Sequence, residues 1–222
     1  MADLTRLVDV SLPIRGNMLL HPGDPAPVLR QLSSVERGDP LTLSELTIGC
    51  HVGTHIDAPA HFIADGSTVD QLDGKHFAGP AVVLDLTGRK EITRGDVETL
   101  SLATGQHILL KTDNSFLLGS NEFADTYCYL TCEAAEFLLG FDPLSIGIDY
   151  YSLDPPSATE FAAHLAVARH GKPAYVCLDL RRITPGNYFF FGFPLNILGV
   201  EGFPVRAILA PSTAESVDMG EP

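Results

Sequence analysis

The sequence predicts a single α/β domain, and three observations lead to this expectation. Short β-rich runs alternate with helical patterns, 222 residues are enough for one sizeable core, and proline and glycine are spread along the chain as turn signals. No internal repeat or linker divides the sequence. We therefore expect one domain over residues 1–211, followed by a loose, polar tail over residues 212–222.

Six runs have the composition of strands, and three have the pattern of helices. The expected strands are residues 81–86, 107–112, 145–149, 174–180, 188–198 and 205–209, and the expected helices are residues 96–102, 132–139 and 158–170. The last helix is the best marked, because Ser157 and Glu160 have the spacing of a capping box and Gly171 with Pro173 forms a stop signal.

The charge and the cysteines narrow the class of protein. Lys and Arg total 14 against 28 Asp and Glu, a net charge of −14 with no basic run, so no nucleic-acid partner is expected. The first residues do not form a signal peptide, and no apolar stretch is long enough to span a membrane. The four cysteines form no CxxC pair, which is typical of reduced thiols, and we expect a cytoplasmic location.

The segment 51–61 concentrates potential metal ligands. A straight strand would separate His51 from Asp57 by about 20 Å, so the segment must bend to hold one ion, and Gly53 and Pro59 are the residues that allow a bend. Four side chains at even spacings would share one face of an extended chain: His51, His55, Asp57 and His61.

This set of side chains predicts a catalytic metal site. Two imidazoles and one carboxylate suit Zn or Mn, and three protein ligands leave positions for water and substrate. An ion held in this way activates water for attack on a carbonyl carbon, and His61 is the natural proton-transfer group. Metal loading and rate should both fall below about pH 6, as histidine becomes protonated. The alternative is that these are unconnected surface histidines.

The run 51–61 resembles the HxGTHxDxPxH signature of the cyclase-like metal-dependent hydrolases, which include bacterial kynurenine formamidase and isatin hydrolase, and it matches every fixed position. Residues 9–13, 22–25 and 204–209 also resemble this family. The resemblance implies a compact β/β/α (swivelling-type) fold, a homodimer or homotetramer, and hydrolysis of C–N bonds in small amides, lactams or formamides with Zn or Mn.

The resemblance also implies roles for individual residues. His51, His55 and Asp57 would be metal ligands and His61 the catalytic proton-transfer residue. His164 matches a family histidine that reaches a second metal or the substrate. The spacing of residues on the expected helix also places His164 on an inward-facing stripe, which consists of Phe161, His164, Leu165 and Ala168.

Two departures from the family pattern affect these expectations. Val176 stands where formamidase-like members have a Glu that completes a second metal site, which favours one ion per chain. His21 stands where relatives often have an aromatic residue against the substrate, and the chain has no Trp. An aryl substrate would need another stacking partner, for which residues 189–191 are candidates. We take His21 and Thr54 as candidate substrate-binding residues and arylformamidase as the second choice of activity.

Two further alternatives remain open. A noncatalytic relative could bind metal or ligand without turnover, although the presence of His61 favours an enzyme. A serine or cysteine nucleophile could use a histidine as base, with Ser115, Ser145 or Cys50 as candidates, but the sequence has no Gly-x-Ser-x-Gly motif.

Overall fold

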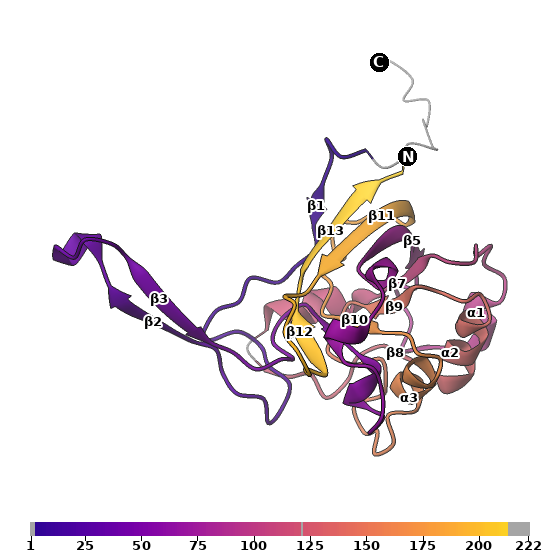
Figure 1. Ribbon diagram of the computed structural model, residues 1–222. Coiled ribbons are helices and arrows are strands. Elements are labelled where there is room, and N and C mark those ends of the chain that lie inside the picture. Colours follow the sequence, from indigo (N-terminus) through magenta and orange to yellow (C-terminus); the bar gives the residue numbers. More distant parts are fainter. Residues whose placement is uncertain (1–2, 121, 213–222) are drawn as a thin grey trace.

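A nine-stranded mixed sheet organises the computed structural model, which describes residues 3–120 and 122–212 (Figure 1). The order of the strands is β1-β13-β11-β5-β7-β9-β10-β4-β12, with parallel pairing from β5 through β7 and β9 to β10 and antiparallel pairing elsewhere. The strands are β1 Val8–Asp9, β4 His55–Asp57, β5 Ala78–Asp85, β7 His107–Lys111, β9 Ser145–Ile148, β10 Ala174–Val176, β11 Gly186–Phe193, β12 Gly202–Pro204 and β13 Arg206–Pro211.

Three helices, α1 Arg94–Val97, α2 Cys132–Leu139 and α3 Ala162–Arg169, lie together on one side of the sheet (Figure 1). Side chains alternate along β5, so Val82 and Leu84 pack with the helices, whereas Ala81 and Val83 pack in a second core on the opposite face. That second core contains residues of β4, β11 and β13, because the sheet curls over it. The result is the single α/β domain that the sequence predicts, with two β layers and one helical layer.

Two smaller sheets and several short 3-10 helices complete the fold. Strands β2 Val28–Ser33 and β3 Leu43–Thr47 form a hairpin that projects away from the body (Figure 1), and β6 Glu91–Ile92 pairs with β8 Tyr129–Leu130. The 3-10 helices are Val35–Arg37, Pro59–His61, Val69–Gln71, Gly74–His76 and Asp113–Gly119. None of the helices in the described ranges is long and apolar enough to cross a membrane.

Most of the predicted elements are present, and helix 132–139 has the predicted bounds. The strand expected over 174–180 is wrong beyond Val176, because Cys177 has a positive φ of 57° and turns the chain away from the sheet. The strand expected over 188–198 runs from Gly186 to Phe193, directly before Pro194. The tail expected over 212–222 lies outside the described residues except for Ser212.

Two helix starts differ from the prediction. The helix expected over 96–102 spans Arg94–Val97, because Thr93 and Asp96 form a capping box there. The helix expected over 158–170 begins at Ala162, and the Asp154 carboxylate, not Ser157, accepts hydrogen bonds from its first backbone N–H groups. The expected inward stripe is therefore incomplete, since Phe161 precedes the helix and is 41% exposed.

A buried histidine at the start of β7 makes fold stability dependent on pH. His107 has no exposed surface, and its ring Nδ1 lies 2.7 Å from the Ser145 hydroxyl. Burial, with a smaller contribution from the charge of His76, lowers the pKa of His107 to about 3. The folded state therefore resists protonation, whereas in the unfolded chain the ring gains a proton near pH 6.5.

We expect the free energy of unfolding to fall by up to about 1.4 kcal/mol per pH unit below pH 6.5 through His107 alone. His107→Asn, whose amide can hydrogen-bond to Ser145 but does not titrate, should show a weaker loss between pH 6.5 and pH 4. Urea unfolding at several pH values measures the difference. Parallel pH profiles for the two proteins would contradict this assignment.

Candidate metal centre

The segment 51–61 bends as its sequence predicts. His51 lies in a turn, Gly53 has a positive φ of 65°, and only His55–Asp57 is strand β4, which is followed by the 3-10 helix Pro59–His61. Strand β4 lies between β10 and β12. At the first residue of β12, a Cβ on Gly202 would lie 2.6 Å from Cε1 of His51, so only glycine leaves room for this ring.

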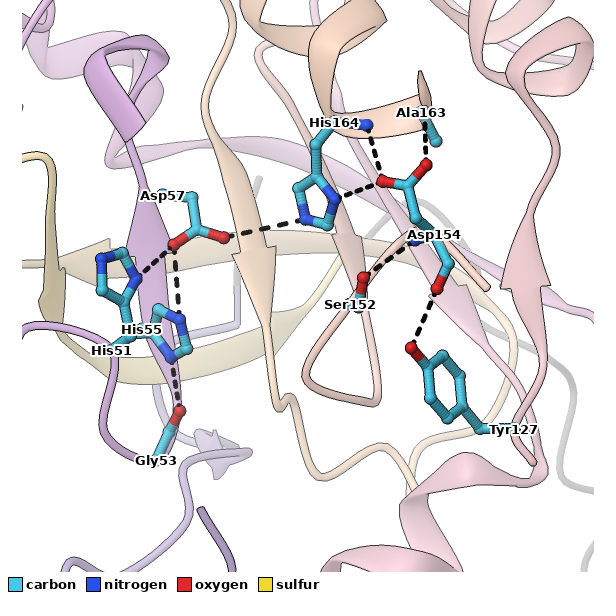
Figure 2. Close-up of polar contacts among 9 residues, drawn as sticks. All are labelled: His51, Gly53, His55, Asp57, Tyr127, Ser152, Asp154, Ala163 and His164. Carbon is cyan, nitrogen blue, oxygen red and sulfur yellow. Dashed lines mark hydrogen bonds and ion pairs between the residues drawn. The ribbon is translucent and has the colours of Figure 1, made fainter. Parts of the chain in front are cut away.

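Three imidazole rings converge on the buried Asp57 carboxylate (Figure 2). His51 Nδ1 lies 2.8 Å and His55 Nε2 3.3 Å from Asp57 Oδ1. From α3, His164 Nε2 lies 3.8 Å from Asp57 Oδ2. The structure thus brings together the three predicted ligands and adds His164 on the other side of the carboxylate.

The second nitrogen of each ring is held by an oxygen atom. His51 Nε2 lies 3.2 Å from Glu201 Oε1. His55 Nδ1 donates to the Gly53 carbonyl at 2.7 Å, and His164 Nδ1 donates to Asp154 at 2.6 Å (Figure 2). A carbonyl oxygen only accepts hydrogen bonds, so the proton of neutral His55 lies on Nδ1. The Nε2 atom, which faces Asp57, then has a lone pair available to coordinate a metal ion. Such outer contacts orient metal-binding imidazoles.

Sequence reasoning missed Glu201 and Asp154. Asp154 accepts hydrogen bonds from the first turn of α3 and from His164, and Glu201 immediately precedes β12. Asp154 lies ten residues before His164, where a search for local capping residues would not look, and Glu201 is 150 residues from His51.

Charges within the cluster shift several pKa values. Burial alone would lower the pKa of His51, but the hydrogen bonds and charges of Asp57 and Glu201 outweigh it and raise that pKa to about 9. Burial opposes ionisation of Asp57, yet His55 and His51 hold its pKa well below the usual range. For His61, burial and the neighbouring histidines outweigh the attraction of Asp57 and lower the pKa, so that ring is neutral at pH 7.

His61 lies close enough to the cluster to have either of two roles. Its ring stacks on His51 with centroids 4.0 Å apart. Potential ligand atoms of His51, Asp57 and His61 all lie within 4.8 Å of one another. The side chains therefore offer two possible sets of metal ligands, which share His51 and Asp57. The predicted set adds His55, and the second set adds His61.

A cavity of about 510 Å³ opens over this cluster. His21, a predicted substrate-binding residue, lies in its wall, whereas Thr54 is buried outside the wall and its hydroxyl donates to the Cys177 carbonyl at 2.6 Å. Phe161 and Leu165, two members of the expected inward stripe, also lie in the wall. The sequence did not indicate a site role for the other wall residues, which are Asp24, Phe62, Tyr151, Ser152, Thr159 and Glu160.

Several sequence candidates lie away from the cavity. Phe190 is fully buried in the second core, and none of residues 189–191 lines the cavity, so the expected stacking role for this run is wrong. Val176 is fully buried and packs in the helix-side core. The buried Ser115 and Ser145 hydroxyls contact Asp149 and His107, and neither serine lines the cavity, nor does Cys50. None of these three candidate nucleophiles is therefore placed to meet a substrate in the cavity.

Residues 8–155 match the family described as "Putative cyclase". The chain belongs to this family. Kynurenine formamidase from Bacillus mycoides (strain KBAB4) is 33% identical over 205 residues, which are 92% of this chain and 97% of the relative. Kynurenine formamidase from Bacillus anthracis is 31% identical over 207 residues, 93% and 98% of the two chains.

Solved structures agree with membership of the putative cyclase family. A potential metal-dependent hydrolase with cyclase activity superposes with a TM-score of 0.81 at 27% identity, covering 93% of this chain and 98% of the other. Isatin hydrolase A from Ralstonia solanacearum has the same fold, with a TM-score of 0.83 at 24% identity over 93% and 92% of the chains. The family and fold predicted from the signature are confirmed.

Proposed function

We propose that this member of the putative cyclase family is a metal-dependent hydrolase that cleaves the C–N bond of a small-molecule amide, lactam or formamide. One observation carries the proposal: three imidazoles surround a single buried carboxylate at the base of a cavity. The relatives named kynurenine formamidase, which align over almost the full chain, support the same class of reaction.

The side chains fit a divalent cation. His164 Nε2 is buried, faces Asp57 and has no hydrogen-bond partner among residues 3–120 and 122–212, as expected for an atom whose natural neighbour is an ion or its bound water. Nitrogen donors with one carboxylate suit Zn or Mn, and we assign His51, His55 and Asp57 as ligands. We assign one ion per chain, because Val176 offers no ligand atom. When bound, the cation would polarise the amide carbonyl and acidify water.

The remaining side chains provide proton transfer and substrate orientation. His61 is neutral at pH 7 because its pKa is lowered, so it can accept a proton as water attacks and then donate it to the departing amine. Glu201 and Asp154 hold His51 and His164 in position. His21 and the aromatic wall would contact the substrate.

Arylformamidase activity is the second candidate. The cavity wall contains Phe62, Tyr151 and Phe161, and the ring centroids of Phe62 and Phe161 are 5.8 Å apart. These rings can form the stacking surface that an aryl substrate needs, although the chain contains no Trp.

Metal content per chain, measured on protein purified without chelator, tests the proposed function. We expect one Zn or Mn per wild-type chain and loss of the ion in His51→Ala. Val176→Glu should raise the content toward two, because β10 pairs directly with β4, with residue 176 opposite His55. Val176→Gln is the matched uncharged control for the cost of a polar group at this buried position. No metal in the wild type after reconstitution would contradict the hydrolase and leave a noncatalytic binding protein.

We also propose a cytoplasmic homodimer or homotetramer. Four free thiols support the location. A two-stranded hairpin is only marginally stable alone, yet the β2–β3 hairpin exposes Val28, Leu29, Leu32, Val35, Leu41, Leu43 and Leu46, which a second copy would cover. Sedimentation velocity measures the assembly, and a monomer throughout the micromolar range would contradict this assignment.

A further inference from the structure

Outside the proposed metal centre, no Lys or Arg balances the acidic side chains of the cavity wall. Asp24, in the loop that leads to β2, and Glu160, two residues before α3, both line the cavity. None of the 14 Lys and Arg side chains does so, and all of these lie in the described ranges. Neither carboxylate forms an ion pair with another side chain of the described residues.

Unpaired carboxylates in the wall of a cleft select ligands by charge. The low-dielectric walls focus the field of Asp24 and Glu160 into the part of the cavity beside these two side chains, which attracts a cationic group there. The opposite field of the proposed metal ion and of His51 acts at the metal centre. A substrate carboxylate would find no Lys or Arg in the wall. A protonated amine would instead have a carboxylate available from either of two separate loops.

The aromatic wall lies directly beside one of these charges. Phe62 stacks on His164, with centroids 4.6 Å apart, so one of its faces is already occupied. Phe161 is 41% exposed and follows Glu160 in the chain. Phe161 and Glu160 both line the cavity, so a ligand ring against Phe161 would share the cavity with the Glu160 carboxylate.

The side of the cavity formed by the metal centre would face the reactive amide of the ligand. The buried, unpartnered His164 Nε2 lies there beside Asp57, together with the proposed metal ligands. A cavity of about 510 Å³ is large enough for one ring with a reactive amide at one end and a substituent at the other.

From this arrangement, and on the basis of the proposed hydrolase function, we infer that the substrate is an aromatic amide that carries a positively charged amine and no compensating carboxylate. The amide lies at the metal centre, the ring lies against Phe161, and the ammonium group lies between Asp24 and Glu160. These two carboxylates determine specificity by binding and take no part in bond cleavage.

Three formanilides with different para substituents test the inference: aminomethyl (cationic), hydroxymethyl (neutral) and carboxymethyl (anionic). Both the dissociation constant for the metal-loaded protein and kcat/KM are measured at low ionic strength. Each surface ion pair is worth a few-fold, so two should give the cationic compound an advantage of about tenfold over the neutral one. Added salt should reduce this advantage. The anionic compound should be the poorest ligand.

Paired variants identify the source of the preference. Asp24→Asn with Glu160→Gln should reduce the advantage of the cationic compound to within about twofold. Glu98→Gln, which removes one negative charge outside the cavity wall, should preserve the advantage. Equal binding and turnover of the cationic and neutral compounds, or a preference that survives the double variant, would overturn the inference and leave the hydrolase intact. A charge preference in binding without hydrolysis of any compound would instead overturn the proposed hydrolase function.

Discussion

Replacing His61 with alanine is expected to lower kcat by about 10²–10⁴-fold while the protein keeps one metal ion per chain. Burial lowers the pKa of His61 below the ordinary value, so its ring is ready to accept a proton at neutral pH. It also lies at the cavity, stacked on His51, where a proton can pass between water and the leaving amine. Metal analysis and steady-state kinetics on the same preparation measure the two quantities together.

His55→Ala is the matched comparison, and it should lose the metal. The two variants distinguish the two ligand sets that the side chains offer, one with His55 and one with His61. Metal loss in His61→Ala together with metal retention in His55→Ala would show that the assigned roles are reversed. Added imidazole should restore part of the turnover of His61→Ala, because a small base can occupy the vacated space. It should not restore the turnover of His55→Ala in the same way, because that variant lacks a metal ligand.

Replacing Asp154 with alanine is expected to lower the free energy of unfolding by about 3 kcal/mol. The Asp154 carboxylate is 2% exposed and accepts three hydrogen bonds, from the backbone N–H groups of Ala163 and His164 and from His164 Nδ1 (Figure 2). Alanine would leave these buried donors without partners at the first turn of α3. In a domain of this size such a loss lowers Tm by roughly 6–12 °C.

Two controls make the Asp154 result specific. Asp154→Asn keeps one acceptor oxygen, so its loss of stability should be smaller. Asp125→Ala, at an exposed position without an ion pair among the described residues, should change stability by less than about 0.5 kcal/mol. Urea unfolding of the metal-free proteins gives the comparison. A loss below 0.5 kcal/mol in Asp154→Ala would mean that water replaces the carboxylate and that His164 is positioned by other contacts.

The close approach of the proposed metal ligands could be predicted from the sequence, because these residues are local. Gly53 and Pro59 lie between the ligands, so the spacing of the segment already contains the bend that brings His51, His55 and Asp57 together. Parallel strands such as 107–112 were also predictable, because buried β-rich runs differ in composition from the turns that flank them.

The parts that were missed depend on tertiary structure. Glu201 contacts His51, which is 150 residues away, and Asp154 contacts His164 at the start of α3. No local sequence pattern marks either residue. The β2–β3 hairpin was missed because its apolar side chains, such as Leu29 and Leu46, cover no core within the chain. Helix α3 begins four residues later than predicted, because a buried carboxylate from a preceding loop outcompetes the local capping signal.

The pairing of β4 with β10 and β12 also determines when a newly made chain can acquire metal. The segment with the ligands leaves the ribosome early, whereas Glu201 and β12 follow about 150 residues later. At ordinary rates of translation this interval is about 8–30 s, during which His51, His55 and Asp57 have no strand on either side to hold them together. Capture of the proposed ion is therefore expected to follow synthesis of the closing strands.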